Sequence, residues 1–165
     1  MITQDRLKEL LHYDECTGHF TWAIDIGRRV KAGDTAGCID GLGYSAIGID
    51  GRKYKAHRLA FMYVNGRFPV GQADHINHIK TDNRWENLRD VSRSDNCKNR
   101  GLLRSNTSGI TGVVCHKSSC RWQAQIMHDG RNVHLGLFTN KSDAIKARIA
   151  AEEKYKYHKN HGKVL

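Results

Sequence analysis

An acid, histidines and widely spaced asparagines share one short basic segment, residues 74–99. Asp74 and His75 are adjacent, and Asn87 and Asn96 follow them. Phosphodiester hydrolysis needs a base that deprotonates water and a cation that neutralises the developing charge. Imidazole suits the first task because its pKa lies near neutral pH, and carboxylate or amide oxygens suit Mg²⁺. The segment therefore indicates a site that holds one divalent metal and a general base against a phosphodiester.

These residues are predicted to lie on a strand, a loop, a second strand and a helix. The predicted ranges are 70–75, 77–86, 87–91 and 93–103. Ser92, followed three positions later by Asp95, has the character of a capping box. This order brings the acid, the histidine and the asparagines near one another. Because Asp74 and His75 are neighbours on a strand, their side chains should point to opposite faces.

Upstream, the sequence predicts a short helix after Thr3, glycine-rich hairpin strands and a second helix. The strands are expected at 19–22, 43–49 and 53–56, and the second helix at 57–64. Downstream, a polar linker at 104–109 precedes three strands at 112–115, 121–128 and 133–138, and a helix at 142–158. The alanines of this last helix, with Ile145 and Ile149 alongside, predict close packing on the sheet.

The chain is strongly basic. It has 27 Lys and Arg against 17 Asp and Glu, a formal net charge of +10, which favours a polyanionic partner over a merely solvated basic surface. There is no signal peptide and no apolar run long enough for a membrane helix, so we expect a cytoplasmic protein of a bacterium or phage-infected host, without a membrane partner. Five cysteines without a Cys-x-x-Cys pair indicate reduced thiols.

The motif residues resemble the HNH endonucleases, specifically the short phage and homing branch of this ββα-metal family. The resemblance rests on Asp74-His75, Asp82-Asn83-Arg84, Asn87-Leu88-Arg89, Asn96 and Asn99, with His57-Arg58-Leu59 upstream. It implies that Asp74 and Asn96 ligate one divalent ion, Mg²⁺ or Mn²⁺, and that His75 is the general base. It implies further that Asn87 orients His75 and pins the loop, with Asn83 and Asn99 in support.

One position departs from that pattern. His78 stands where relatives commonly carry glycine, so we expect a different turn there, and the side chain is a candidate metal or phosphate contact. Basic residues around the catalytic element are candidate DNA-backbone contacts. They are Arg84, Arg89, Arg93, Lys98 and Arg100.

Residues 106–157 resemble an AP2 domain, which docks a three-stranded sheet in the DNA major groove with a helix packed behind. Arg121-Trp122 and the Leu135-Gly136-Leu137-Phe138 run carry this resemblance. It makes six residues candidate DNA contacts, although Trp122 equally suits a core position. They are His116, Arg121, Trp122, Gln125, Arg131 and His134.

The sequence thus predicts an α+β chain with a hairpin-rich HNH module at 1–104, whose ββα-metal core covers about 68–103, and an AP2-like domain at 105–165. The expected function is metal-dependent hydrolysis of duplex DNA by a monomer or homodimer, without a small-molecule cofactor. Two alternatives remain open at this stage. One is a DNA-binding regulator that keeps the nuclease fold without activity, and the other is an RNA-binding accessory protein.

Overall fold

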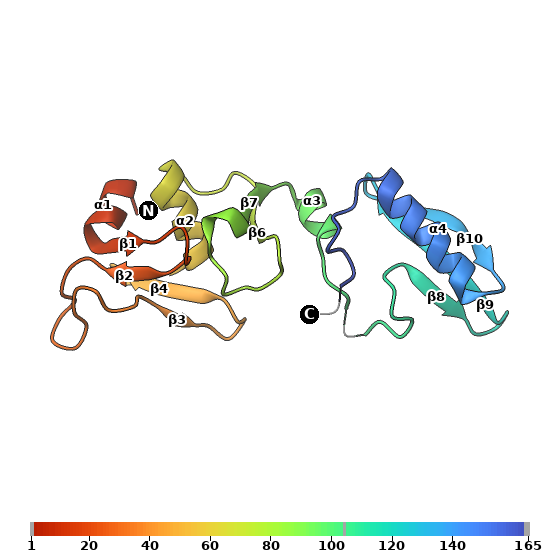
Figure 1. The fold of residues 1–165 in the computed structure, drawn as a ribbon, viewed down its shortest axis with the longest axis horizontal. Helices are drawn as coiled ribbons and strands as arrows, with labels where there is room; N and C mark the ends of the chain where they lie inside the picture. The colour runs from red at the N-terminus through yellow and green to blue at the C-terminus, as the bar shows by residue number, and fades with distance from the viewer. Residues whose placement is uncertain (1, 104, 164–165) are drawn as a thin grey trace. The chain divides into compact units, whose positions relative to one another are not determined.

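The computed structural model describes residues 2–103 and 105–163, which form four α-helices and several small antiparallel sheets (Figure 1). The α+β class is therefore confirmed. The chain divides into two compact units, residues 1–92 and 93–165. The predicted domain boundary at residue 104 lies outside the described residues. Among the described residues, no helix has both the length and the apolar composition needed to cross a bilayer.

The positive charge is concentrated in the second unit. Residues 1–92 contain 13 Lys and Arg against 12 Asp and Glu, a net charge of +1, whereas residues 93–165 contain 14 against 5, a net charge of +9. An attraction to polyanions is therefore a property of the second unit far more than of the first.

The first unit begins with a capped helix and two small sheets. Helix α1 spans Gln4–Leu10, and Thr3 caps it by accepting a hydrogen bond from the backbone N–H of Arg6. Strands β1 (Leu11–Tyr13) and β2 (Phe20–Trp22) pair with each other, and β3 (Cys38–Ile39), β4 (Ser45–Ile49) and β5 (Arg52–Lys55) form a three-stranded sheet. Helix α2 (Ala56–Asn65) follows, ending at Gly66 in the left-handed conformation.

One hydrophobic core holds these elements together. Its fully buried members come from α1, β1, β4 and α2, and include Leu7, Leu11, Ile47 and Leu59. Phe61 of α2 packs edge-on against Trp85, which lies in the loop before β7. The core thereby fixes α2 against the loop that carries the motif residues.

The motif residues of the first unit lie on a two-stranded sheet and on the loop that joins its strands. Strand β6 (Gln72–His75) pairs antiparallel with β7 (Leu88–Val91), and a short 3₁₀ helix, η1 (Trp85–Asn87), ends the loop between them. The prediction that the first strand begins at Val70 is wrong by two residues. The backbone N–H groups of Val70 and Gly71 donate to the carboxylate of Asp90 at 2.9 Å instead of to a neighbouring strand.

The second unit opens with a helix shorter than predicted. Helix α3 covers Arg93–Lys98, so the prediction that it continues to Leu103 is wrong. The N–H groups of Asn99 and Arg100 bond to carbonyls three residues back, which tightens the last turn. Leu102 then donates to the carbonyl of Lys163, which ties this part of the chain to the C-terminal segment.

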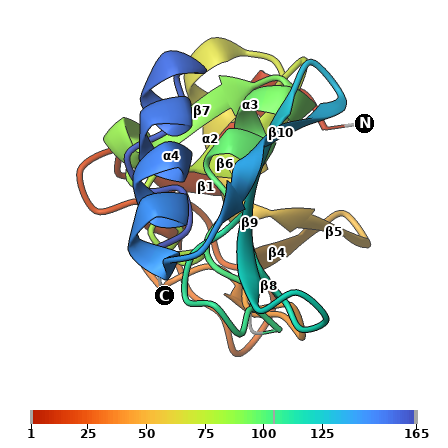
Figure 2. The same cartoon turned by 90° about the vertical axis from the view of Figure 1, so that its right-hand side faces the viewer.

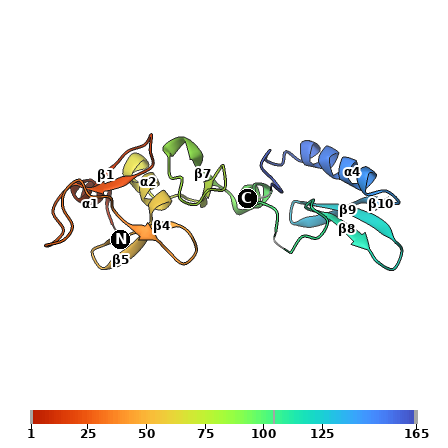
Figure 3. The same cartoon turned by 60° about the horizontal axis from the view of Figure 1, so that its bottom comes forward.

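Three strands and one helix make up the rest of the second unit. The sheet has the order β10 (Arg131–Phe138), β9 (Arg121–His128), β8 (Val113–His116), and α4 (Lys141–Lys154) packs on one of its faces (Figures 2 and 3). The predicted three-stranded antiparallel sheet with one helix is confirmed, whereas its likeness to AP2 domains stays a prediction. The helix ends four residues before predicted, and the backbone N–H of His158 bonds to Lys98 instead.

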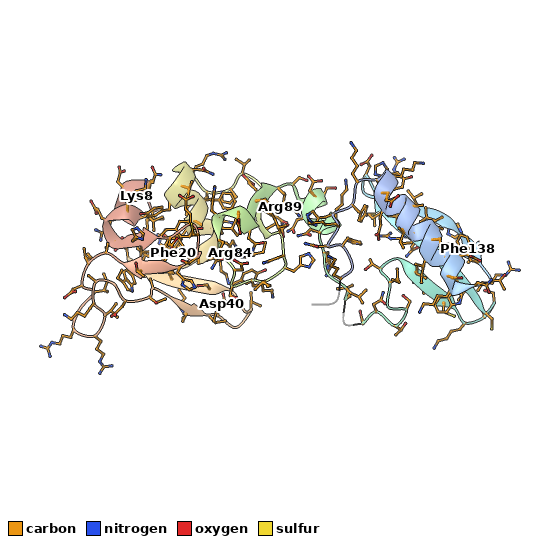
Figure 4. The ribbon with its side chains drawn as sticks, viewed as in Figure 1. Lys8, Phe20, Asp40, Arg84, Arg89 and Phe138 are labelled. Atoms are coloured by element: carbon orange, nitrogen blue, oxygen red, sulfur yellow. The ribbon has the colours of Figure 1, made fainter. Side chains whose placement is uncertain are left out.

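Small side chains bring α4 close to the sheet, as predicted. Ala144 is fully buried against Val113 and Ala124, with Phe138 packed beside them (Figure 4). Ile149, which we predicted alongside these alanines, is half exposed. Arg148 is buried instead, four residues after Ala144 on the same stripe, and its guanidinium donates to the carbonyl of Gln125 at 2.6 Å and to Glu152 at 2.8 Å.

Candidate active site

His75 is the buried titratable group at the end of β6. Its ring is 5% exposed, and its Nε2 lies 3.1 Å from Oδ1 of Asn83. Because a carboxamide oxygen only accepts, Nε2 carries the proton, and Nδ1 carries the lone pair. Burial lowers the pKa of His75 below its ordinary value, and this effect exceeds the opposing effects of Asn83 and of Asp74. The imidazole is therefore neutral near pH 7, which is the form that accepts a proton.

The preceding residue, Asp74, has a cationic partner on the neighbouring strand. Asp74 and Arg89 are directly opposite in the β6–β7 register. Arg89, which is labelled in Figure 4, donates from Nε at 2.9 Å and from Nη2 at 2.7 Å to Oδ2 of Asp74. We predicted Arg89 as a DNA contact, and the structure places its guanidinium on this carboxylate. The strand alternation thus gives Asp74 and His75 different partners on different sides of β6.

The loop between β6 and β7 is held by an asparagine that we expected to act on His75 itself. The Asn87 side chain accepts from the backbone N–H of Asn77 and donates both to the side chain of Asn77 and to the carbonyl of Asp82, at 2.8 to 3.0 Å. Both amide hydrogens of Asn87 are thereby used on the loop. The His75 ring instead donates a hydrogen bond to the side chain of Asn83, for which we expected only a supporting role.

Arg84, a second predicted DNA contact, is committed to the same loop. Its guanidinium forks onto Asp82 at 2.8 and 2.9 Å and also contacts Glu86 at 2.9 Å (Figure 4). The hydrogen bond from Arg84 lowers the pKa of Asp82 to about 2. Asp82 is therefore a charged structural anchor and has no proton to exchange near neutral pH.

The backbone at His78 adopts the conformation that a glycine would take. Its φ is 67°, in the left-handed region, and its N–H bonds to the carbonyl of His75 at 3.1 Å. The histidine therefore takes a left-handed conformation that favours glycine, and the expected difference in the turn stays a prediction. Histidine tolerates this region better than most residues, at some cost in strain.

His57, which we named in the family resemblance but did not predict as a site residue, is a second buried imidazole. It lies in the first turn of α2, 4.9 Å from the His75 ring in a T-shaped contact, and Tyr44 packs 5.3 Å from it. Burial, followed by the proximity of His75, lowers the pKa of His57 to about 3. Its spacing from the apolar residues Ala60 and Phe61, three and four positions on, was the available signal that it faces the core.

The donor chemistry of the predicted metal ligands fits Mg²⁺ or Mn²⁺. Asp74 supplies a carboxylate and Asn96 an amide oxygen, and Mg²⁺ needs only one or two protein oxygens besides water and phosphate. Residues 2–103 and 105–163 contain no group of three or more His, Cys, Asp or Glu side chains that could hold a metal ion. Asp74 belongs to the first unit, Asn96 belongs to α3 of the second unit, and the buried Asn99 directly follows that helix.

The predicted DNA contacts of the second unit fall into two groups. Arg93 and Arg100 are exposed, whereas Lys98 is partly buried and lies 3.9 Å from Asp95. On the sheet, alternation from the buried Ala124 places Trp122 on the face that α4 covers, where it joins the core. Arg131 is exposed at the hairpin end of β10, and because it pairs with His128, the same alternation places it on the other face from Gln125. The open face carries the four remaining predicted residues. They are His116, Arg121, Gln125 and His134.

Gln123 on this open face was missed by the sequence reading. It accepts from Nε2 of His116 at 2.8 Å and donates to Gln125 and to Nδ1 of His134, both at 3.3 Å. Its position between Arg121 and Gln125, two residues from each on the same strand, was a signal that could have found it.

Comparison with known proteins agrees with the motif. Residues 54–98 match the family model described as HNH endonuclease, so the predicted resemblance is confirmed for the segment from β5 to α3. A solved structure described as "DNA binding and cleavage by the HNH homing endonuclease I-HmuI" is 26% identical, with a TM-score of 0.42, and the match covers 55% of this chain and 51% of that one. The chain thus spans about half of that structure's length. No curated protein matches.

Proposed function

We propose that this chain is an HNH endonuclease of the phage or homing type, which hydrolyses phosphodiester bonds in duplex DNA with one Mg²⁺ or Mn²⁺ ion. The observation that carries the proposal is the neutral, hydrogen-bonded His75 beside Asp74, inside the segment that matches the HNH endonuclease family. A buried imidazole with a fixed tautomer is suited to one task, which is to take a proton at a defined point in space.

Each residue of the site then has a defined task. His75 accepts the proton of the attacking water on Nδ1. Asn83 holds the ring through Nε2, so that Nδ1 is the nitrogen that faces the reacting phosphate. Asn87 keeps the loop that carries Asn83 in place. Asp74 and Asn96 would hold the divalent ion, which when bound neutralises charge on the phosphate and on the leaving oxygen.

DNA delivery falls to the second unit in this proposal. Its net charge of +9 supplies the attraction to the phosphate backbone, and the open face of β8, β9 and β10 is a β-ribbon surface of the kind that enters a major groove. This is the role that the AP2-like resemblance of residues 106–157 implies. With one such site in each chain, a monomer would nick one strand and a dimer would cut both.

The direct test is a metal-supplemented cleavage assay on plasmid and genomic DNA. The wild-type chain should convert supercoiled DNA to nicked or linear forms with Mg²⁺ or Mn²⁺ and not with EDTA. His75→Ala should lose this activity while still binding DNA, and His12→Ala, which removes an exposed imidazole on β1, should keep it. Equal cleavage by the wild type and His75→Ala would contradict the assignment of the base.

One observation favours a second candidate, a DNA-binding regulator without nuclease activity. Oδ2 of Asp74, the proposed metal ligand, accepts two hydrogen bonds from Arg89, and a guanidinium already balances its charge. A regulator of this kind would bind duplex DNA equally well with and without divalent ions. It would also release no nicked product in the assay above at any metal concentration.

A further inference from the structure

The open face of the second-unit sheet carries a connected network of amide and imidazole side chains. Gln123 on the central strand β9 joins His116 of β8 to Gln125 of β9 and His134 of β10. The Asn132 amide on β10 then donates from Nδ2 to Oε1 of Gln125 at 2.9 Å. The network therefore runs across all three strands of the sheet.

This network fixes which way each amide points. Both hydrogens of Nε2 of Gln123 are used, on Gln125 and His134, and its Oε1 accepts from His116. Oε1 of Gln125 accepts twice, from Gln123 and from Asn132, which leaves Nε2 of Gln125 as a donor. Exposed side chains normally lose conformational entropy when they bind a partner. The hydrogen bonds of this network order the side chains before binding, so part of that loss has already occurred.

Asn132 is the residue that presents a complete recognition edge. One hydrogen of its Nδ2 is used on Gln125, and within the described part of the chain its other hydrogen and its Oδ1 bond to no protein atom. The residue is exposed, and its amide therefore offers one donor and one acceptor side by side in a set orientation. Adenine has the complementary pair in the major groove, the N7 acceptor and the N6 donor.

Apolar side chains flank this polar network in register. Met127, 53% exposed, is the direct cross-strand partner of Asn132. Val114 and Leu137, both 49% exposed, are the partners of Gln123 on its two sides. Apolar contact with the C5-methyl group is how side chains recognise thymine. Asn132, which can bond to adenine, and Met127, which can contact the thymine methyl group beside it, together match one A·T pair.

We infer that the open face of β8, β9 and β10 reads A·T pairs in the major groove, with Asn132 as the adenine-specific residue and Met127 as the thymine-methyl contact. This inference rests on the proposed DNA-binding function of the second unit and adds its base preference. A guanine at the same position presents two acceptors, so Oδ1 of Asn132 would face O6 without a hydrogen bond. A cytosine at this position presents only the N4 donor, so Nδ2 of Asn132 would have no acceptor.

The charges around the face favour DNA as its occupant. Among the described residues of the second unit, the carboxylates lie on α3, on α4 and at Asp129 in the β9–β10 hairpin, and none lies on the open face itself. Lys117, Arg121 and Arg131 lie at the ends of the strands, where they would meet phosphates on either side of a groove. A protein partner that buried this face would have to cover these three cations as well.

The experiment is a selection of random duplex DNA by the full-length chain in EDTA, so that no cleavage occurs, followed by sequencing of the bound pool. The wild type is expected to enrich A·T at one or more positions. Asn132→Ala should reduce the preference at one of these positions by about tenfold, within the roughly 5- to 150-fold range of one bidentate contact. Asn140→Ala, an exposed asparagine at the start of α4, is the matched control and should leave the selected sequence unchanged.

A second variant makes the test independent of simple loss of binding. Asn132→Arg replaces a donor and an acceptor with two donors, and it should move the selected base at that position towards guanine, because arginine pairs with N7 and O6. Affinity for unselected duplex at low salt, with its salt dependence, reports the proposed DNA-binding function separately.

The outcomes separate the two ideas. If the wild type binds duplex DNA in a salt-dependent manner but selects no A·T position, or if Asn132→Ala and Asn132→Arg select the same sequence as the wild type, the base-reading inference is wrong and DNA binding stands. If the wild type binds single-stranded RNA or a protein through this face and does not bind duplex DNA, both the inference and the proposed function fail.

Discussion

The buried imidazole of His57 gives the most quantitative prediction, a loss of stability in mild acid. Burial and the nearby His75 hold the pKa of His57 at about 3, whereas an unfolded chain titrates histidine near its ordinary value of about 6.5. Lys55 and Arg58 act in the same direction, and Asp40 opposes them. Below pH 6.5 the unfolded chain binds a proton that the folded chain does not, so stability falls as the pH falls.

The size of this effect follows from the two pKa values. At pH 7 the contribution is close to zero, and at pH 5 the unfolded state gains about 2 kcal/mol from protonating this one residue. His57→Leu removes the titrating group with little change in volume, and it leaves no broken hydrogen bond at Nδ1, which has no partner among the described residues. We expect this variant to stay within about 1 kcal/mol of wild type at pH 7.

The assay is urea unfolding at pH 7 and pH 5, followed by hydrogen exchange of the amides of α2, which reports the first unit alone. The wild type should lose about 2 kcal/mol more than His57→Leu between the two pH values. His75 also titrates in both proteins, so the difference between them isolates His57. Equal losses in the two proteins would refute the assignment of this pKa to burial in the native fold.

Three further predictions concern the site itself. Asn83→Ala should lower the cleavage rate about ten- to a hundredfold without changing DNA affinity, because the His75 ring loses its orienting hydrogen bond; an unchanged rate, measured by single-turnover nicking, would exclude that role. Arg89→Gln should tighten Mn²⁺ binding, measured by electron paramagnetic resonance, because the substitution removes the guanidinium that competes with the metal for Asp74. Weaker DNA binding with unchanged Mn²⁺ affinity would make Arg89 a DNA contact instead. His78→Gly should raise the free energy of unfolding, measured in urea, by about 0.5–1 kcal/mol, since its left-handed backbone suits glycine. A destabilised variant would show that packing of the imidazole stabilises the fold.

The sequence was most informative where local pattern decides structure. The helix of the first unit that follows the hairpins was predicted within one residue at each end, because its apolar spacing and the Asn65-Gly66 stop are local signals. For β9, the sequence predicted the strand itself but not which of its residues face away from α4. It left Trp122 ambiguous, because only the position of α4 decides which face of the sheet is covered.

The hydrogen-bond partners of the site residues could not be predicted, because they come from parts of the chain that are distant in sequence or joined by an irregular loop. The Asp74–Arg89 pair requires the register of β6 against β7, which is set across a loop held by Asn87. That loop also decides that Asn83, eight residues from His75, reaches its ring. Arg148 shows the same limit in the second unit, since a charged residue on a helix is expected to be exposed until its hydrogen-bond partners are known.

The central claim is that His75 is the base of a metal-dependent DNA cleavage reaction. The most direct measurement is sequencing of the ends that the chain generates on a random duplex library with Mg²⁺ or Mn²⁺, alongside His75→Ala. The account predicts new 5′-phosphate and 3′-hydroxyl ends in the wild-type sample, concentrated at a recurring sequence, and none above background with His75→Ala. A wild-type chain that binds the library but yields no more ends than His75→Ala in either metal would contradict it.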